Sequence, residues 1–483
     1  MRMLLMADWW LNPWAVWGNF SWLVPVIVNS IIKLLGGAAW LLVLALAARA
    51  DTAPECNLRA LARQAQGDLN GAIAEENRAL ELAPDFAEAY FVRGRVQLLL
   101  GRPAEAMADF SQAVKYQPGF APAYCARADA RLAGGDSLGA LIDYNLAILN
   151  QPDLVAAYAG RAQTRRLRGD LDGAIADDAK VLASQPRDAG AFANRAAARL
   201  ARGDFAGALA DDTQSLLLKP DQAEVYNNSA LARKGGGDLA GALQDFNQAL
   251  ELKPDYADAF LGRAYVRSLQ GDLAGAAADD TRAIGYRPAD AAAYYNRGAA
   301  RQALGDLAGA GDDFDHALDL NPDFAYAYRN RGVMRYDAHD FVNAELDFRK
   351  ALALDPSLIY IRFRVWLARS RLGRPDAATA ELRAFLDDLP PGGPPDWPVM
   401  VGRFLADELA ETDFLVAAQH ADFAKKEGCQ CEAFYYVGSK HLLAGDNAGA
   451  ADFFKKAVAT GRKDLQEYLS AAAELECLKT VKP

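Results

Sequence analysis

The chain has 483 residues, of which 52% are hydrophobic and 24% charged, a balance that excludes a globally disordered polypeptide. Its formal net charge is −11, from 63 acidic and 52 basic residues, which argues against a nucleic-acid-binding protein because a phosphate track needs clustered Lys and Arg. The length suits several domains or one long repeat array.

The first fifty residues differ in composition from the rest of the chain. Lys33 is followed by an apolar run from Leu34 to Ala48 and by the small-x-small triplet that ends at Ala50. A basic residue, a short apolar run and such a triplet form the pattern of a cleavable secretory signal. The run is short for a membrane span, which needs roughly twenty residues. Residues 1–50 are therefore predicted to be a signal peptide, with a periplasmic mature chain.

An uncleaved anchor in the inner membrane is the alternative interpretation of residues 1–50. The stretch from Trp22 to Ala48 is apolar apart from Asn29, Ser30 and Lys33. Residues 1–30 also hold five tryptophans ahead of the basic residue, so translation is expected to begin near Val28. A peptide covering residues 9–22 in the mass spectrum of the expressed protein would refute that start.

From residue 53 onward, prolines, glycines and alanines recur with a common period of 34 residues. One histidine, His339, replaces a glycine of the series. Three residue types that share one period over ten copies indicate a repeat architecture in which each copy is a single supersecondary unit. The prolines of the series are Pro84, Pro118, Pro152, Pro186, Pro220, Pro254, Pro288, Pro322, Pro356 and Pro390.

Each copy is predicted to form two antiparallel helices, as the copy 257–290 illustrates. Gly271 ends the first helix because glycine accepts the left-handed conformation at a helix C-terminus. Asp272 then caps the second helix by accepting hydrogen bonds from free backbone N–H groups. Ala276 is small, so the two helices can approach closely. Pro288 stops the second helix, since proline lacks the N–H and clashes with the preceding turn.

This arrangement resembles the tetratricopeptide-repeat family over residues 53–390, as ten tandem repeats. The resemblance implies an all-α, right-handed superhelical solenoid of about ten to eleven helix-turn-helix repeats with a C-terminal capping helix. It also implies a non-enzymatic scaffold that binds peptides or proteins in an inner groove lined by the first helix of each repeat. In the copy 87–120 the family's positions read Tyr90, Gly94, Gln97, Ala106, Phe110, Ala113 and Pro118.

Arginines in the first helices and aspartates sixteen residues later recur through seven copies. We interpret them as partly buried ion pairs inside each repeat, because seven repetitions of one geometry favour scaffolding over catalysis. Ser229 interrupts the arginine series, so Asp245 needs another partner or water. The pairs are Arg93 with Asp109, Arg127 with Asp143, Arg161 with Asp177, Arg195 with Asp211, Arg263 with Asp279, Arg297 with Asp313, and Arg331 with Asp347.

Asparagine precedes this ladder position in four copies: Asn194, Asn228, Asn296 and Asn330. The row resembles the asparagine ladder inside the repeat superhelix of eukaryotic O-linked sugar transferases, where such side chains grip a peptide backbone. An amide offers both a donor and an acceptor, which suits backbone binding. The alternative is that asparagine is simply tolerated on the groove wall.

Tyr295 and Tyr326 are further candidates for the groove, since aromatic residues anchor interfaces. The alternative for both is packing against the next repeat. Arg329 is the one basic residue that directly precedes one of the four asparagines. A carboxylate clamp needs paired basic residues, so that type of groove is disfavoured.

The C-terminal part departs from the regular array. Residues 391–430 are predicted to form a linker and a degenerate helical pair, and residues 431–483 a degenerate repeat with a capping helix. This end loosely resembles the C-terminal portions of bacterial envelope repeat proteins, including scaffold lipoproteins. Cys431 and Cys477 are a candidate disulfide.

The chain contains no HExxH, GxSxG, Walker or dinucleotide-binding motif. We therefore expect no enzymatic activity, no cofactor and no metal site. The alternative is an enzyme whose catalytic residues lie in the groove or in residues 391–430. The expected partner is a protein or peptide, not a nucleic acid, and a membrane only through an uncleaved anchor. The oligomeric state stays open.

Overall fold

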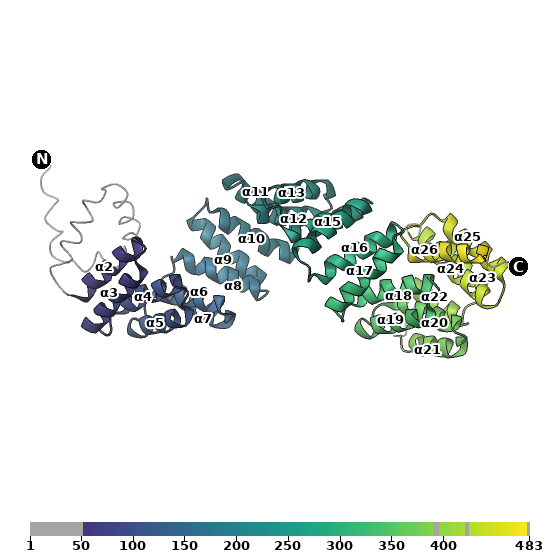
Figure 1. The fold of residues 1–483 in the computed structure, drawn as a ribbon, viewed down its shortest axis with the longest axis horizontal. Coiled ribbons are helices and arrows are strands. Elements are labelled where there is room, and N and C mark those ends of the chain that lie inside the picture. The colour runs from purple at the N-terminus through teal and green to yellow at the C-terminus, as the bar shows by residue number, and fades with distance from the viewer. Residues whose placement is uncertain (1–51, 390–395, 421–424, 481–483) are drawn as a thin grey trace. The chain divides into compact units, whose positions relative to one another are not determined.

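The computed structural model describes residues 52–389, 396–420 and 425–480, which form helices and no strands (Figure 1). The predicted signal or anchor at residues 1–50 and most of the predicted linker at residues 390–395 lie outside these ranges. No helix within them is long and apolar enough to cross a bilayer. The chain divides into two compact units, Met1–Pro220 and Asp221–Pro483.

Helices of the first unit follow one another as pairs, each pair matching one copy of the 34-residue period. They are α2 Ala53–Ala65 with α3 Leu69–Leu82, α4 Ala87–Leu99 with α5 Pro103–Tyr116, α6 Ala121–Ala133 with α7 Ser137–Asn150, α8 Val155–Leu167 with α9 Leu171–Ser184, and α10 Ala189–Arg202 with α11 Phe205–Leu218.

The second unit continues the same pairing and ends on a helix without a partner of its own. Its helices are α12 Ala223–Gly235 with α13 Leu239–Leu252, α14 Ala257–Leu269 with α15 Leu273–Tyr286, α16 Ala291–Ala303 with α17 Leu307–Leu320, α18 Ala325–Asp337 with α19 Phe341–Leu354, α20 Ile359–Arg371 with α21 Pro375–Asp387, α22 Trp397–Leu405 with α23 Glu411–His420, α24 Lys426–Leu443 with α25 Asn447–Ala459, and α26 Gln466–Thr480.

The turn between α14 and α15 has the chemistry that the sequence predicts. Gly271 has φ +83°, a left-handed conformation that only glycine adopts without strain. The Asp272 side chain accepts a hydrogen bond from the backbone N–H of Gly275 and so caps α15. His339 adopts the same left-handed region with φ 63°, which shows that the turn geometry persists where the glycine series breaks.

Neighbouring pairs stack in chain order within each unit, so the predicted helical solenoid is confirmed. First helices of successive pairs also contact one another directly: α2 with α4, α6 with α8 and α8 with α10 in the first unit, and α12 with α14, α14 with α16 and α18 with α20 in the second. The first helices therefore lie on the inner side of each stack. We call the surface that they form the inner face.

From α18 to α26 the buried apolar side chains form a single cluster, so the C-terminal helices share a core with the last regular repeats. Helix α24 begins at Lys426, ahead of the predicted start at residue 431, and α26 corresponds to the predicted capping helix. The predicted disulfide is wrong. Cys431 is a free thiol, fully buried, and donates to the carbonyl of Ala457, 3.6 Å away.

Candidate functional site

The predicted ion-pair ladder is built as a two-pronged contact between the helices of each repeat. Arg263 on α14 donates from Nε to Asp279 Oδ2 at 2.8 Å and from Nη2 to Asp279 Oδ1 at 2.6 Å. The Asp279 side chain is buried, and the arginine keeps a small exposed edge. The structure brings together the members of all seven predicted pairs. Bonding to Asp109 raises the pKa of Arg93, which keeps the guanidinium charged.

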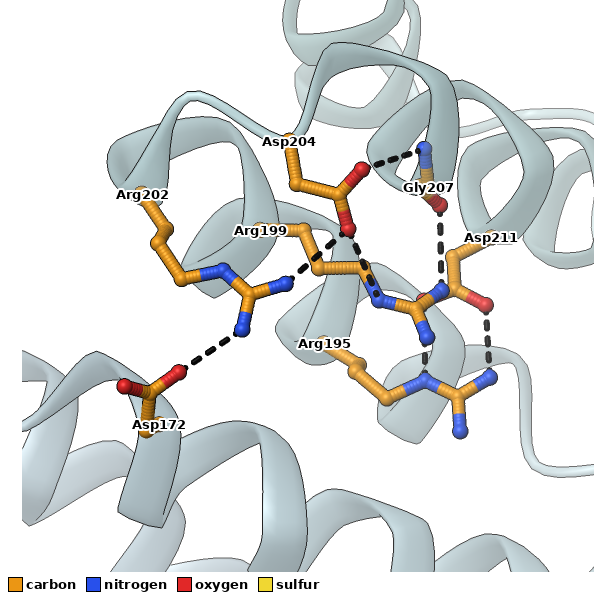
Figure 2. Close-up of polar contacts among 7 residues, drawn as sticks. All are labelled: Asp172, Arg195, Arg199, Arg202, Asp204, Gly207 and Asp211. Carbon is orange, nitrogen blue, oxygen red and sulfur yellow. Dashed lines mark hydrogen bonds and ion pairs between the residues drawn. The ribbon is translucent and has the colours of Figure 1, made fainter.

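A second arginine, which the sequence interpretation missed, completes six of the seven ion pairs; Gln97 occupies its position beside Arg93 and Asp109. Arg199 lies one helical turn after Arg195 and donates to Asp211 Oδ2 at 2.7 Å and to the Gly207 carbonyl at 3.1 Å (Figure 2). The cap residue Asp204 lies 3.8 Å from the same guanidinium. The signal that could have found it is another 34-residue series: Arg131, Arg165, Arg199, Arg233, Arg267, Arg301 and Arg335.

The first arginine also links one repeat to the repeat before it. Arg263 Nη1 donates to Asn247 Oδ1 at 2.6 Å, and Asn247 belongs to the second helix of the preceding pair. Equivalent contacts join Arg93 to Asn77, Arg161 to Asn145 and Arg331 to Asp315. One guanidinium therefore holds three helices, and we assign this row a structural role.

Where serine replaces the first arginine, the acid finds two smaller partners. Ser229 Oγ donates to Asp245 Oδ2 at 2.6 Å, and Arg233 Nε donates to the same oxygen at 2.8 Å. The Asp245 side chain is 16% exposed, whereas that of Asp279 is 3% exposed. The carboxylate is thus partly hydrated instead of fully enclosed.

The four asparagines lie on first helices but differ in their surroundings. In the first unit, Asn194 is exposed on α10. In the second unit, Asn228, Asn296 and Asn330 are half-buried on α12, α16 and α18. Within the described ranges, hydrogen bonds are formed by the side chain of Asn330 and not by those of the other three.

Asn330 is the centre of a chain of polar contacts across α16 and α18. Its Nδ2 donates to the Tyr295 hydroxyl at 3.3 Å, and its Oδ1 accepts from Arg329 Nε at 3.0 Å. The Arg329 guanidinium lies over the ring of Tyr326, 5.1 Å from the centroid. Tyr326 remains 44% exposed. Part of the Asn330 amide is therefore engaged within the protein, while the aromatic face beside it is open.

Tyr295 contributes chiefly to packing between repeats. Its ring centroid lies 6.0 Å from that of Phe314 in its own repeat and 4.9 Å from that of Phe324, which precedes the next helix pair. This is the contact expected of a residue that packs against the next repeat. The Tyr295 hydroxyl therefore lies at the inner face, whereas its ring is packed between two repeats.

Elsewhere in the array, the asparagine position packs against an aromatic ring of the preceding repeat. A Cβ at Gly262 would lie 2.3 Å from Phe246 Cζ, and a Cβ at Gly160 would lie 2.4 Å from the ring of Tyr144. Such distances leave room for glycine alone. The aromatic ring and a larger side chain at this position thus compete for one space.

Asp280 occupies the aromatic position in the repeat before Asn296. One repeat earlier, the ring of Phe246 fills the space beside Gly262. Asp280 is shorter and leaves the equivalent space open, which makes room for the side chain of Asn296. The same exchange pairs Asp178 with Asn194 in the first unit. The rule is not strict, since Phe314 precedes Asn330. The sequence interpretation treated these asparagines as groove residues and missed the packing that allows them.

Asp178 and Asp280 are buried acids, with one carboxylate oxygen each that has no hydrogen-bond partner in the described part of the chain. Burial, with a contribution from the adjacent Asp177, raises the pKa of Asp178 to about 7. Burial and the adjacent Asp279 raise the pKa of Asp280 to about 8. Part of each population of these carboxyl groups is thus protonated near neutral pH, since a buried carboxyl avoids carrying charge.

Models of known families match three segments of the chain. A model described as TPR repeat matches residues 235–271, and a model described as tetratricopeptide repeat matches residues 57–124 and 300–359. The chain contains tetratricopeptide repeats. This agrees with the stacked helix pairs and with the period of 34 residues. Proteins built from such repeats are generally scaffolds for interactions with other proteins.

Several solved structures are similar to parts of the chain. A tetratricopeptide-repeat protein from Parabacteroides merdae is 19% identical, with a TM-score of 0.42, over 49% of this chain and 93% of that one. The type IV pilus biogenesis factor PilW is 19% identical, with a TM-score of 0.39, over 43% and 96%. YrrB, described as having an unusual peptide-binding site, is 15% identical, with a TM-score of 0.36, over 38% and 95%. No curated protein matches the chain.

Proposed function

We propose that this tetratricopeptide-repeat protein is a non-enzymatic scaffold that binds a polypeptide segment of a partner protein on the inner face of its second unit. The observation that carries the proposal is the pair of half-buried amides of Asn228 and Asn296, which form no hydrogen bond to any described residue. Each amide can accept from a backbone N–H and donate to a backbone carbonyl of an extended segment.

Exposed aromatic rings on the neighbouring first helices α14 and α18 support this proposal. Tyr265 on α14 is 50% exposed and carries the Lys234 ammonium 4.8 Å from its ring centroid. Tyr326 on α18 is 44% exposed under Arg329. Rigid aromatic side chains contribute much of the binding energy at protein interfaces and lose little conformational entropy there. Amides and rings together fit a segment that is recognised partly through its backbone.

For the location, we propose export to the bacterial envelope, on the pattern of residues 33–50. A periplasmic scaffold follows if this segment is cleaved, and an inner-membrane-anchored assembly factor follows if it is retained. Cell fractionation followed by an alkaline wash of the membranes separates the two. Release into the soluble periplasmic fraction supports cleavage, and retention in the washed membranes supports an anchor.

A photo-crosslinking amino acid placed at Tyr326 tests the inner face directly. We expect it to cross-link a partner polypeptide in cells, whereas the same amino acid at Val342, which is 55% exposed on the second helix α19, should not. Asn228→Ala combined with Asn296→Ala should reduce the cross-link at least fivefold without changing helicity. Equal cross-linking at positions 326 and 342, or no effect of the double substitution, would refute the proposal.

A further inference from the structure

Two cationic side chains on the first helices α12, α14, α16 and α18 of the second unit have no acidic partner. The other basic residues of these four helices all form ion pairs with aspartates; they are Arg233, Arg263, Arg267, Arg297, Arg301, Arg331 and Arg335. Lys234 on α12 and Arg329 on α18 form no ion pair with any residue that the structure describes.

The acidic residues of the same helices are already engaged. Glu224 and Asp258 each pair with a basic residue that follows the second helix of the same repeat. Asp337, the last residue of α18, faces Arg364 of the C-terminal core. The uncompensated charge on this part of the inner face is therefore positive, although the whole chain carries a net charge of −11.

Lys234 connects the first helices of two neighbouring repeats. Its side chain is half-buried, and its ammonium lies 4.8 Å from the ring centroid of Tyr265 on α14, which is exposed. An ammonium held over a ring in this way keeps N–H donors free for a ligand. A carboxylate that accepts from it would form a charge-assisted hydrogen bond, which is stronger than a neutral one.

Arg329 repeats this arrangement on a helix three repeats later. Its guanidinium lies 5.1 Å from the ring centroid of the exposed Tyr326, and its Nε donates to Asn330 Oδ1. Its two Nη groups form no hydrogen bond with a described residue. The bond to Asn330 fixes the guanidinium, which leaves the Nη groups as two parallel donors of the kind that bind one carboxylate.

The two cations lie at either end of the stretch that carries the free amides. Asn228 shares α12 with Lys234, and Asn296 lies on α16, the first helix before α18. We propose that the segment bound on the inner face of the second unit is acidic, with one side-chain carboxylate at Lys234 and another at Arg329. This inference rests on the peptide binding proposed above and names the chemistry of the partner. One C-terminal carboxylate would fill only one of the two sites, because three repeats separate them.

The test uses the full chain and a fluorescent peptide of alternating glutamate and serine, amidated at its C-terminus. A length of about twelve residues spans roughly 40 Å in the extended form. Alternation places carboxylates at short intervals, so their spacing need not be known. We expect this peptide to bind at least tenfold more tightly than the same peptide with glutamine in place of glutamate. The glutamine peptide with a free C-terminal carboxylate should bind no better than its amidated form.

Substitutions at the two cations identify the contacts. Lys234→Met and Arg329→Met keep an apolar side chain beside each ring, and each should weaken binding of the glutamate peptide at least threefold. Lys234→Arg and Arg329→Lys should retain it. Arg282→Met is the matched control, because Arg282 is exposed on the second helix α15 without an ion pair, 5.9 Å from the ring centroid of Phe260. It removes the same charge away from the inner face and should leave affinity unchanged.

The net charge of −11 repels an anionic peptide at long range, so a preference for glutamate has to come from local contacts. Equal binding of the glutamate and glutamine peptides, or equal effects of Lys234→Met and Arg282→Met, would overturn the acidic partner. Absence of binding by a chain of unchanged helicity would overturn it too. If Asn228→Ala with Asn296→Ala weakens both peptides equally and neither is preferred, the proposed function stands and this inference falls. A glutamate preference that needs Lys234 and Arg329 but neither asparagine supports the acidic partner and refutes the amide contacts.

Discussion

Gly262 faces Phe246 so closely that a Cβ at Gly262 would lie 2.3 Å from Phe246 Cζ. We predict that Gly262→Ala lowers the free energy of unfolding by about 1–3 kcal/mol, because the added methyl group overpacks a fully buried ring. Urea unfolding followed by circular dichroism measures the loss.

Gly285 provides the matched control for that substitution, since it also lies in a helix but a Cβ there meets nothing within 4 Å. Gly285→Ala should stabilise the protein by about 0.5–1 kcal/mol through helix propensity alone. Equal effects of the two substitutions would contradict the close contact at Gly262.

Asp279 is enclosed by two arginines, and its charge should matter more than that of Asp245. Asp279→Asn leaves Arg263 and Arg267 beside a neutral group in a largely enclosed setting. We expect a loss of roughly 3–5 kcal/mol in the free energy of unfolding, as for a broken buried pair. Asp245→Asn should cost distinctly less, since its carboxylate is 16% exposed. Chemical denaturation measures the free energy of unfolding of both variants. A larger loss for Asp245→Asn than for Asp279→Asn would refute this account of the ladder.

Asp280 should make stability fall as the pH rises toward 8. Its pKa is raised to about 8 in the folded chain, from an ordinary value of 3.8 that applies once the chain unfolds. Below about pH 4 both states are protonated; above it the unfolded state loses its proton first, so unfolding releases a proton and becomes easier. This residue alone contributes a slope of about 1.4 kcal/mol per pH unit across the window, which ends near the folded pKa.

Asp280→Asn should remove that slope. Urea unfolding of the substituted and unmodified chains at pH 5.5 and at pH 7.5 gives the comparison. The stability difference between the two chains is expected to shift in favour of the variant at the higher pH. A pH-independent difference would show that Asp280 is not protonated in the folded protein.

Asp280 and Asn296 should behave as one unit, because they replace an aromatic–glycine pair. Asp280→Phe alone should destabilise the protein, since the side chain of Asn296 occupies the space of the ring. Adding Asn296→Gly recreates the arrangement of Phe246 and Gly262. We expect a coupling free energy of about 1–3 kcal/mol in a double-mutant cycle. Additive effects would mean that the two positions do not share space.

Much of the repeat itself was predictable from the sequence because its signals are local. Gly271, Asp272 and Pro288 act on their own backbone or on that of the next few residues, so their spacing alone indicates where helices end and begin. The pairing of Arg263 with Asp279 could also be inferred, because residues at a fixed spacing across a tight turn lie on facing helices.

The candidate site depends on contacts between repeats, which local spacing does not reveal. Asn330 looked equivalent to Asn296, yet the structure shows its amide bonded to Tyr295 and Arg329. No pattern in the sequence singled out Arg364, yet it receives Glu467 from a helix that follows about a hundred residues later. The sequence therefore determined the helix pair and its period. The tertiary structure alone decided which inner-face side chains are covered, because that depends on the distant segment packed over each position.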